Sequence, residues 1–305
     1  EQLGVPDWVA QRLWLGTIMV GAGGGVLFLG RTWRWRPTSA TAAAFLYALS
    51  PFVLTLAARI SVLLLPFAGL PWLLALTVRA LHSKGWRHPA LFGLVVATVG
   101  SVNATSVLLV GLVPVLWILY SAFGSRDVTT SRAATTATKI GAVTIAVNLW
   151  WIGGLSVQAT DGIEVLRYTE TAKVVADASV SHEVLRGLGY WFFYGGDRLG
   201  PWIEPSVDYT QRLWLLGLTY ALPILGLLAL GVVRWRHRTF LVGMLLLGTV
   251  IAIGAHPWGS PSPAGGFIKA FLLTDVGLAM RSLPRAVPLV ALAMALAIGA
   301  AVGAL

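Results

Sequence analysis

The chain alternates apolar runs, each about 20 residues long or more, with short segments that are rich in arginine. Hydrophobic residues make up 57% of its 305 residues and charged residues only 11%, whereas a soluble protein has about 25% charged residues. Lipid is therefore the solvent for most of the chain. Because a helix satisfies its own backbone hydrogen bonds in lipid, the sequence predicts an all-α polytopic membrane protein.

Charged residues are divided unequally between the two sides of the predicted membrane. Of the twelve carboxylates, all but that of Asp127 fall in segments on one side. The other side carries basic segments at 31–36, at 84–87, at 126–139 and at 234–238. Under the positive-inside rule, these basic segments are cytoplasmic, and the acidic segments lie on the extracytoplasmic side.

The apolar runs, oriented by the basic segments, predict about nine crossings. The run at 90–120 is too long for one ordinary crossing and is interrupted by the polar stretch 101–105. We therefore expect two short helices that meet at Asn103. The full set of predicted crossings is 9–29, 38–57, 61–81, the two halves of 90–120, 140–157, 213–233, 240–255 and a last one that begins near Arg285.

One long polar stretch, 158–212, separates the predicted crossings at 140–157 and 213–233. We expect it to form an extracytoplasmic loop, followed later by a Pro- and Gly-rich outer segment at 256–284. The chain starts without methionine and ends within an apolar run, so residues 1–305 are expected to be a fragment of one transmembrane domain. The acids of the long loop are Asp161, Glu164, Glu170, Asp177, Glu183, Asp197, Glu204 and Asp208.

Glycines and prolines within the apolar runs predict how the helices pack and bend. Gly21 and Gly25 form a pair of small residues four positions apart, a spacing that lets two membrane helices approach closely. Prolines bend or break a membrane helix, and neighbouring groups then satisfy the freed backbone. Those expected to do so here are Pro51, Pro66, Pro71 and Pro114.

Several common classes of function have no support in the sequence. The formal net charge of +10 is concentrated in short loops, which indicates contact with lipid headgroups and argues against nucleic acid as a partner. There are no cysteines, and the five histidines are not spaced like metal ligands on a helix. No serine has the strand–turn–helix context of a hydrolase nucleophile. We therefore predict no metal and no cofactor.

Four residues near predicted membrane ends or turns are candidates for substrate binding. Arg59 lies at the outer end of the second crossing, where it would hold a lipid phosphate or reach lipid headgroups. Asn103 would bind a ligand or satisfy the broken backbone around it. Trp150 and Trp151 would stack on a sugar or belong to the aromatic belt of the membrane surface.

The long polar loop holds the other three candidates. Glu170 lies in the segment 167–171, and Glu183 and Arg186 lie in 181–187. Both segments combine carboxylates, arginine and aromatic or aliphatic residues, a composition that suits a polar substrate above the membrane. A solvated helix face has the same composition, so a purely structural role is the alternative.

Several short motifs resemble, in order, those of a known family. They are Tyr-Ala-Leu-Ser-Pro at 47–51, Val-Leu-Thr at 53–55, Pro-Trp at 71–72, Val-Asn-Ala at 102–104, Leu-Trp-Trp at 149–151, and Glu-Val-Leu-Arg-Gly at 183–187 with Trp191. About the first 210 residues thus resemble the membrane domain of the mycobacterial alpha-(1→3)-arabinofuranosyltransferase D family. The chain departs from the family after Ile60, where a serine-rich stretch with a glutamate is replaced by Ser61 and aliphatic residues, which allows a different donor or acceptor.

The resemblance implies a GT-C-like transmembrane helix bundle and a glycosyltransferase activity. The enzyme would take arabinofuranose from a polyprenyl-phosphate donor and add it to cell-wall arabinan, in arabinogalactan or lipoarabinomannan, on the outer face of the plasma membrane. It also implies a general base, an Asp or Glu in the first extracytoplasmic loop, which would precede Glu1. The alternatives are a transporter or flippase for a lipid-linked glycan, and a non-catalytic assembly subunit.

Overall fold

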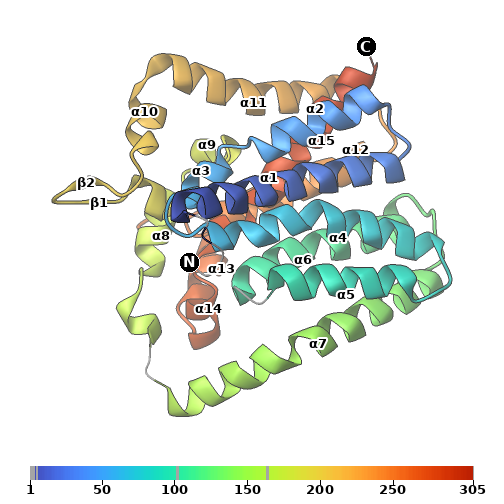
Figure 1. The fold of residues 1–305 in the computed structure, drawn as a ribbon, viewed down its shortest axis with the longest axis horizontal. Helices are drawn as coiled ribbons and strands as arrows, with labels where there is room; N and C mark the ends of the chain where they lie inside the picture. Colours follow the sequence, from blue (N-terminus) through green and yellow to red (C-terminus); the bar gives the residue numbers. More distant parts are fainter. Residues whose placement is uncertain (1–3, 5, 101–102, 163–164, 305) are drawn as a thin grey trace.

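The computed structural model of the protein describes residues 4, 6–100, 103–162 and 165–304, and it shows long helices lying side by side (Figure 1). Within these described ranges, seven spans are long and apolar enough to cross a membrane, and they match seven of the predicted crossings. The other two predicted crossings are the 14-residue α5 (Arg87–Gly100) and the 16-residue α12 (Arg238–Ile253). The full number of crossings therefore stays a prediction. The seven spans are Asp7–Thr32, Pro37–Ala57, Ser61–His82, Ala104–Gly124, Thr130–Gln158, Leu213–Val232 and Leu283–Ala304.

The elements divide into long helices and short ones. Besides α5 and α12, the long helices are α1 (Asp7–Thr32), α2 (Pro37–Ala48), α4 (Leu65–His82), α6 (Ala104–Leu119), α7 (Thr130–Asp161), α11 (Leu213–Val232) and α15 (Val287–Ala304). The short helices are α3 (Phe52–Ala57), α8 (Ala172–Ala178), α9 (Ser181–Leu185), α10 (Pro205–Gln211), α13 (Pro263–Leu272) and α14 (Asp275–Ala279). Single helical turns are η1 (Ser61–Leu64), η2 (Tyr120–Gly124), η3 (Val165–Tyr168), η4 (Trp191–Tyr194) and η5 (Leu283–Ala286). One antiparallel hairpin pairs β1 (Gly196–Asp197) with β2 (Gly200–Pro201), so Gly196 faces Pro201.

Prolines and polar caps set the helix boundaries. Pro51 lies in the break between α2 and α3, and Pro71 and Pro114 lie inside α4 and α6. The 90–120 run forms two helices, as expected, with Asn103 as the N-cap of α6. The side chain of Thr129 accepts a hydrogen bond from the Arg132 N–H, so α7 starts ten residues earlier than the predicted 140 and continues beyond 157.

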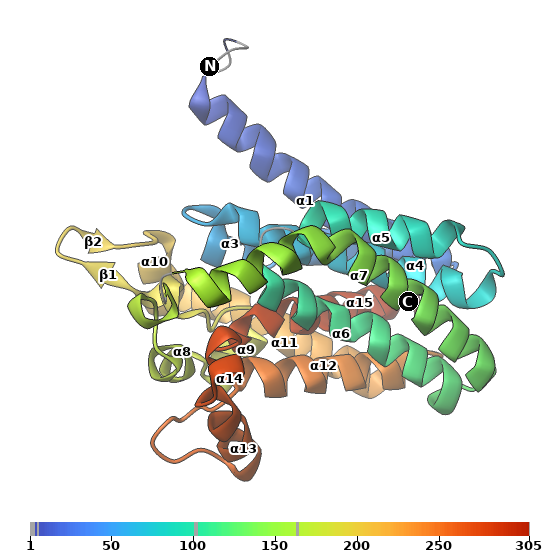
Figure 2. The ribbon, with the colours of Figure 1, turned by 90° about the horizontal axis from the view of Figure 1, so that it is seen from below.

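Two helices, α4 and α15, form the centre of the bundle. Of the most apolar stretch of each span, 72% is buried in Ser61–His82 and 67% in Leu283–Ala304. The same share is only 11% in Thr130–Gln158 and 22% in Leu213–Val232. The helix α4 contacts α1, α5 and α6, and α15 contacts α2, α11 and α12. The outward apolar faces of α7 and α11 are those that lipid is expected to cover. Figure 2 shows the N-terminal half of α1 projecting away from the other helices.

The connections at 33–36, 83–86, 125–129 and 233–237 gather at one end of the bundle, which we call the basic end (Figure 1, right). Arg236 links two of them, because its Nη2 lies 2.6 Å from Asp127 Oδ1 and its carbonyl accepts a hydrogen bond from the Tyr120 hydroxyl. Trp33 packs against Trp235 and His237. Burial lowers the pKa of His237 to about 4, so its imidazole is neutral at physiological pH.

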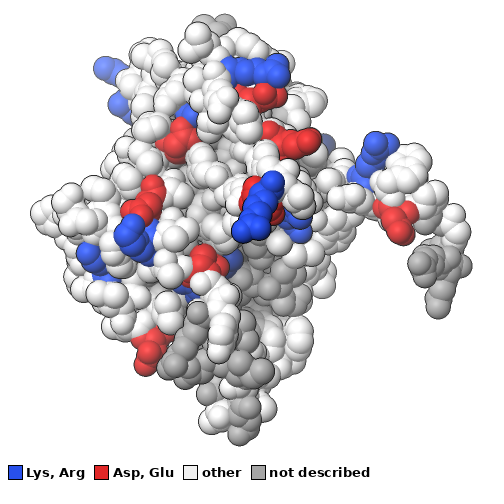
Figure 3. Space-filling model, turned by 90° about the vertical axis from the view of Figure 1, so that its left-hand side faces the viewer, with Lys and Arg blue, Asp and Glu red and all other residues white. Residues whose placement is uncertain are grey.

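The opposite end of the bundle carries the short elements α3, α8, α9, α10, α13, α14 and the β1–β2 hairpin, and we call it the acidic end (Figure 1, left). Acidic and basic side chains are interspersed over this face (Figure 3). The predicted polar loop 158–212 is thus a folded layer rather than an open strand of chain. It is held to the bundle by a small apolar cluster of Leu188, Phe193 and Ile203, packed against Leu54 of α3.

Candidate functional site at the acidic end

The turn after α9 packs against the break between α2 and α3. Gly187 and Gly189 have φ angles of +83° and +89°, in the left-handed region that glycine adopts without steric cost. A Cβ atom placed on Gly187 would lie 3.3 Å from Ser50 Oγ, so the two segments are in close contact. The motifs at 47–51 and 183–187, which are distant in sequence, therefore meet in space.

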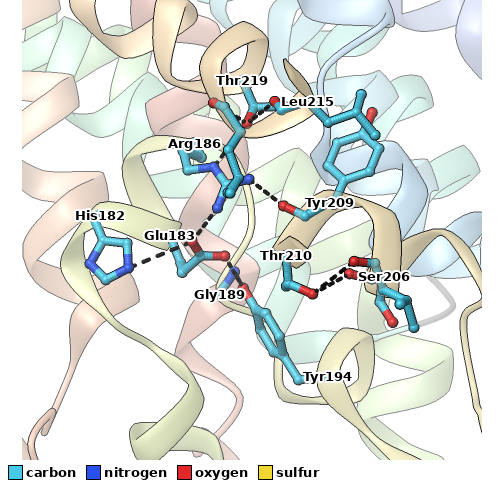
Figure 4. A network of polar contacts seen from close by, with 12 residues as sticks. His182, Glu183, Arg186, Gly189, Tyr194, Ser206, Tyr209, Thr210, Leu215 and Thr219 are labelled. Carbon is cyan, nitrogen blue, oxygen red and sulfur yellow. Dashed lines mark hydrogen bonds and ion pairs between the residues drawn. The ribbon is translucent and has the colours of Figure 1, made fainter. Parts of the chain in front are cut away.

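Glu183 in α9 is at the centre of a buried polar network (Figure 4). Its Oε1 accepts a hydrogen bond from Arg186 Nη1, and its Oε2 accepts one from the Tyr194 hydroxyl at 2.6 Å. His182 Nε2 lies 3.6 Å from Oε1. Burial, and then the negative charge of Glu183, raise the pKa of Tyr194 far above its ordinary value, so the hydroxyl stays protonated and donates a hydrogen bond to the carboxylate.

Arg186 connects this network to α10 and α11. It is 2% exposed, its Nε donates to Thr219 Oγ1 at 3.0 Å, and its Nη2 donates to the Tyr209 carbonyl at 2.8 Å. The guanidinium carbon also lies 4.8 Å from the centre of the Tyr220 ring. A buried arginine with this many fixed partners joins three elements, so the arrangement indicates a structural link.

Glu170 takes part in a second acid–arginine cluster, just before α8. Ser282 Oγ donates to its Oε1 at 2.7 Å, and Arg281 Nε donates to its carbonyl at 2.7 Å. Arg281, which is 6% exposed, also donates to the Leu278 carbonyl and to Thr169 Oγ1. Arg281 therefore holds the segment 169–170 against the segment 278–282, although the two are more than 100 residues apart in the chain.

Asn103 and Arg285 meet beside this second cluster. Asn103 Oδ1 accepts hydrogen bonds from the Ser106 N–H at 2.8 Å and from Arg285 Nη1 at 2.8 Å. The structure therefore gives Asn103 the capping role that was the alternative to ligand binding. Its oxygen also positions an arginine that precedes α15, and a direct contact with substrate stays a prediction.

The remaining candidates lie apart from both clusters. Arg59 is exposed at the end of α3, and its Nε donates to the Trp202 carbonyl at 3.3 Å. Trp150 is 68% exposed on the outward face of α7, and Trp151 donates to Asn148 of the same helix. The exposed Trp150 suits the aromatic belt of a membrane surface, and the binding of a sugar by either indole stays a prediction.

A cavity of about 340 Å³ lies beside Glu170. No sequence pattern indicates this cavity, because its walls come from three separate segments: 166–173, the α13–α14 junction, and Trp258. A second cavity, beside Arg186, measures only about 20 Å³, little more than the roughly 10–15 Å³ that one water needs. The larger one can hold a small ligand; it is lined by Leu166, Thr169, Glu170, Thr171, Ala172, Lys173, Trp258, Leu272, Leu273, Thr274, Asp275 and Leu278.

Fold and comparison together define the class of protein, a polytopic helical membrane domain with a folded polar layer at one end. A family model described as the N-terminal GT-C domain of alpha-(1->3)-arabinofuranosyltransferase matches residues 1–305. The chain belongs to this family, which confirms the resemblance. The match also extends the resemblance past residue 210, into apolar helices whose sequences contain few distinctive motifs.

Similar proteins include two mycobacterial chains named alpha-(1->3)-arabinofuranosyltransferase. The one from Mycobacterium tuberculosis is 31% identical over 300 residues, and the one from Mycolicibacterium smegmatis is 29% identical over 301 residues; the matches cover 95% and 96% of this chain. A cryo-EM structure of arabinofuranosyltransferase AftD from mycobacteria aligns with a TM-score of 0.65 and 25% identity, over 97% of this chain and 19% of that one. The chain spans about one fifth of the length of these relatives, 20% in both sequence matches.

Proposed function

We propose that this chain is the membrane part of a glycosyltransferase that transfers arabinofuranose from a polyprenyl-phosphate donor to cell-wall arabinan. The observation that carries the proposal is the family match over residues 1–305, together with the name shared by both relatives. In this proposal the basic end faces the cytoplasm and the acidic end faces outward, because arginine and lysine are retained on the cytoplasmic side.

The reaction requires a general base, an acceptor hydroxyl and a leaving phosphate. The base takes the hydroxyl proton while the oxygen attacks the anomeric carbon, and the bond from that carbon to the lipid phosphate breaks with its electron pair leaving on the phosphate. We assign the base to an Asp or Glu of the first extracytoplasmic loop of the whole enzyme, ahead of Glu1. Glu183 is not assigned this task, because both of its oxygens accept hydrogen bonds in a buried network.

Arg59 is our candidate for binding the phosphate of the lipid carrier. Its side chain is exposed at the acidic end, in the turn that follows α3. A guanidinium binds phosphate oxygens in pairs and would stabilise the charge that develops on the leaving group. Glu170 lines a cavity at the same end and is the candidate for contact with the sugar of the acceptor.

The proposal is tested by transfer of radiolabelled arabinofuranose from a decaprenyl-phosphate donor to a synthetic arabinan acceptor, in membranes that contain the full-length protein. We expect transfer that is lost when the acid of the first outer loop is replaced by its amide. In the same assay, Arg59→Gln should raise the KM for the donor, while Arg198→Gln, an exposed arginine of the β1–β2 hairpin, should not.

No transfer by a folded protein that still binds the donor would contradict the proposal and would favour a flippase or an assembly subunit. An equal KM in the two arginine variants would remove Arg59 from the donor site and leave the activity unaffected.

A further inference from the structure

The cavity beside Glu170 has two kinds of wall. One is apolar and aromatic, made of Trp258 with leucines of α13 and α14, and the other is polar, with Glu170 and Asp275. Pockets for small molecules typically measure about 300–1,000 Å³ and combine apolar walls with a few fixed polar groups. At about 340 Å³ the cavity is at the small end of this range, which suits a short sugar unit.

Hydrogen bonds and apolar contacts hold the cavity in shape without a ligand. Arg281 bonds to residues of both walls, through the carbonyls of Glu170 and Leu278. A small apolar cluster that includes Ala172 and Leu272 packs beneath, with Trp258 against it. Walls fixed in this way need little reordering when a ligand binds, which favours affinity.

The charges around the cavity argue against a phosphate as its ligand. Two carboxylates line it: Glu170, whose Oε2 lies 3.5 Å from Arg281 Nη2, and the exposed Asp275, which has no such partner among the described residues and would repel an anion. Two of the nearby cations are paired with carboxylates, Lys173 with Asp177 at 2.6 Å and Arg281 with Glu170 at 3.5 Å, and Lys269 Nζ donates to the Trp258 carbonyl at 2.7 Å. The cavity is therefore unlike the site expected for the lipid carrier.

The same groups suit a neutral sugar. The indole of Trp258 is flat and apolar with a polar edge, so it can pack against the C–H face of a sugar ring. Lys269, whose Nζ lies 4.7 Å from the centre of that indole, helps to keep it in place. Carboxylates accept hydrogen bonds from hydroxyl groups, and a sugar offers several such donors.

We propose that the cavity between Thr169–Lys173 and the α13–α14 junction is a binding subsite for the neutral glycan acceptor, with Trp258 as its stacking residue and Glu170 and Asp275 as acceptors for sugar hydroxyls. This inference rests on the proposed function for the identity of the sugar. It separates the acceptor, beside Glu170, from the carrier phosphate, near Arg59.

The test is direct binding of a neutral arabinofuranose oligosaccharide to the purified full-length protein. Trp258→Ala should raise the Kd about tenfold, since the loss of one aromatic contact is worth about a factor of ten. Glu170→Gln and Asp275→Asn should each raise it by a smaller factor. Trp214→Ala is the matched control, because this indole is 64% exposed on α11 and does not line the cavity. Binding of the polyprenyl-phosphate donor should be the same in all four variants.

Three outcomes would overturn the inference. They are no binding of the oligosaccharide by the wild-type protein, an unchanged oligosaccharide Kd in the cavity variants, or cavity variants that lose binding of the donor instead of the oligosaccharide. Thermal unfolding identifies variants that do not fold. If Trp258→Ala is among them, the oligosaccharide Kd of Asp275→Asn, a conservative change at an exposed residue, decides between the outcomes. Arabinofuranose transfer by the wild-type protein with an unchanged Kd in the variants would reject the subsite alone. Absence of transfer would reject the proposed function.

Discussion

At the scale of single residues, the two acid–arginine clusters of the acidic end differ in what surrounds them. Glu183 has both oxygens bonded, and the cavity near Arg186 is about 20 Å³. Both oxygens of Glu170 also have partners, Ser282 and Arg281, but Glu170 lines a cavity of about 340 Å³. We therefore expect the first cluster to stabilise the folded layer at 158–212 and the second to be accessible to a ligand.

Replacing Arg186 with methionine should destabilise the protein strongly. The change leaves the Glu183 carboxylate buried without its cationic partner, and breaking a buried ion pair in this way costs about 3–5 kcal/mol. The double variant Glu183→Gln/Arg186→Met should recover part of the loss, because no buried charge is then left unpaired. Thermal unfolding in detergent measures both variants.

Arg212→Met is the matched control for this prediction. Arg212 and Asp208 form a pair at 2.6 Å in the same layer, but the two side chains are 58% and 44% exposed. An exposed pair contributes about 0–1 kcal/mol, so the melting temperature should change little. Equal losses in Arg186→Met and Arg212→Met would show that the buried network has no special role.

At the scale of helices, the contact between α1 and α4 depends on glycine. Trp72 Nε1 donates to the Gly21 carbonyl at 2.8 Å, and the ring stacks on Phe28 with 5.1 Å between centres. A Cβ atom on Gly25 would lie 2.6 Å from Trp72 Cδ1 and 2.7 Å from Pro71 Cγ. The glycine pair expected from the sequence thus lies in the contact between α1 and α4.

Two Gly→Ala changes in α1 should have opposite effects. Gly25→Ala should lower stability by about 1–3 kcal/mol, the cost of overpacking, because the hydrogen bond and stacking keep the Trp72 ring from moving. Gly16→Ala meets no atom within 4 Å, and alanine favours the helix by about 0.5–1 kcal/mol. Melting temperatures compare the two, and a fall of equal size in both would contradict the packing argument.

At the scale of the whole molecule, the two ends of the bundle differ in charge and in structure. The basic end consists of short turns joined by contacts such as that of Arg236 with Asp127. The acidic end holds a layer of short helices and nearly all of the carboxylates among the residues that the structure describes. This polarity predicts a fixed orientation in the membrane.

Single cysteines test the orientation, since these 305 residues contain no cysteine. Leu199 is 99% exposed in the β1–β2 hairpin, so Leu199→Cys should react in intact cells with a thiol reagent that does not cross membranes. Lys84→Cys, at the exposed turn between α4 and α5, should react only after the cells are opened. The reverse pattern would invert the topology and contradict the proposed outer site. The full-length protein without an added cysteine supplies the background.

The sequence by itself determined the class of fold and most helix positions, because lipid imposes strict demands on length and polarity that are visible in a linear pattern. The break at Pro51, the pair of helices meeting at Asn103 and the close contact at Gly25 followed from local chemistry of that kind. The extent of α7 was missed, since its polar first turns are helical for reasons of capping and not of hydropathy.

Only the tertiary structure decided how the polar groups are shared between binding and stability. Composition marked Glu170 and Glu183 alike, and the difference between them arises from Arg281, Trp258 and Tyr194, which lie in other segments. A cavity is a property of three-dimensional packing, and its walls here join segments about 100 residues apart. No pattern of spacing along the chain encodes such a meeting, because it depends on how the whole bundle brings its loops together.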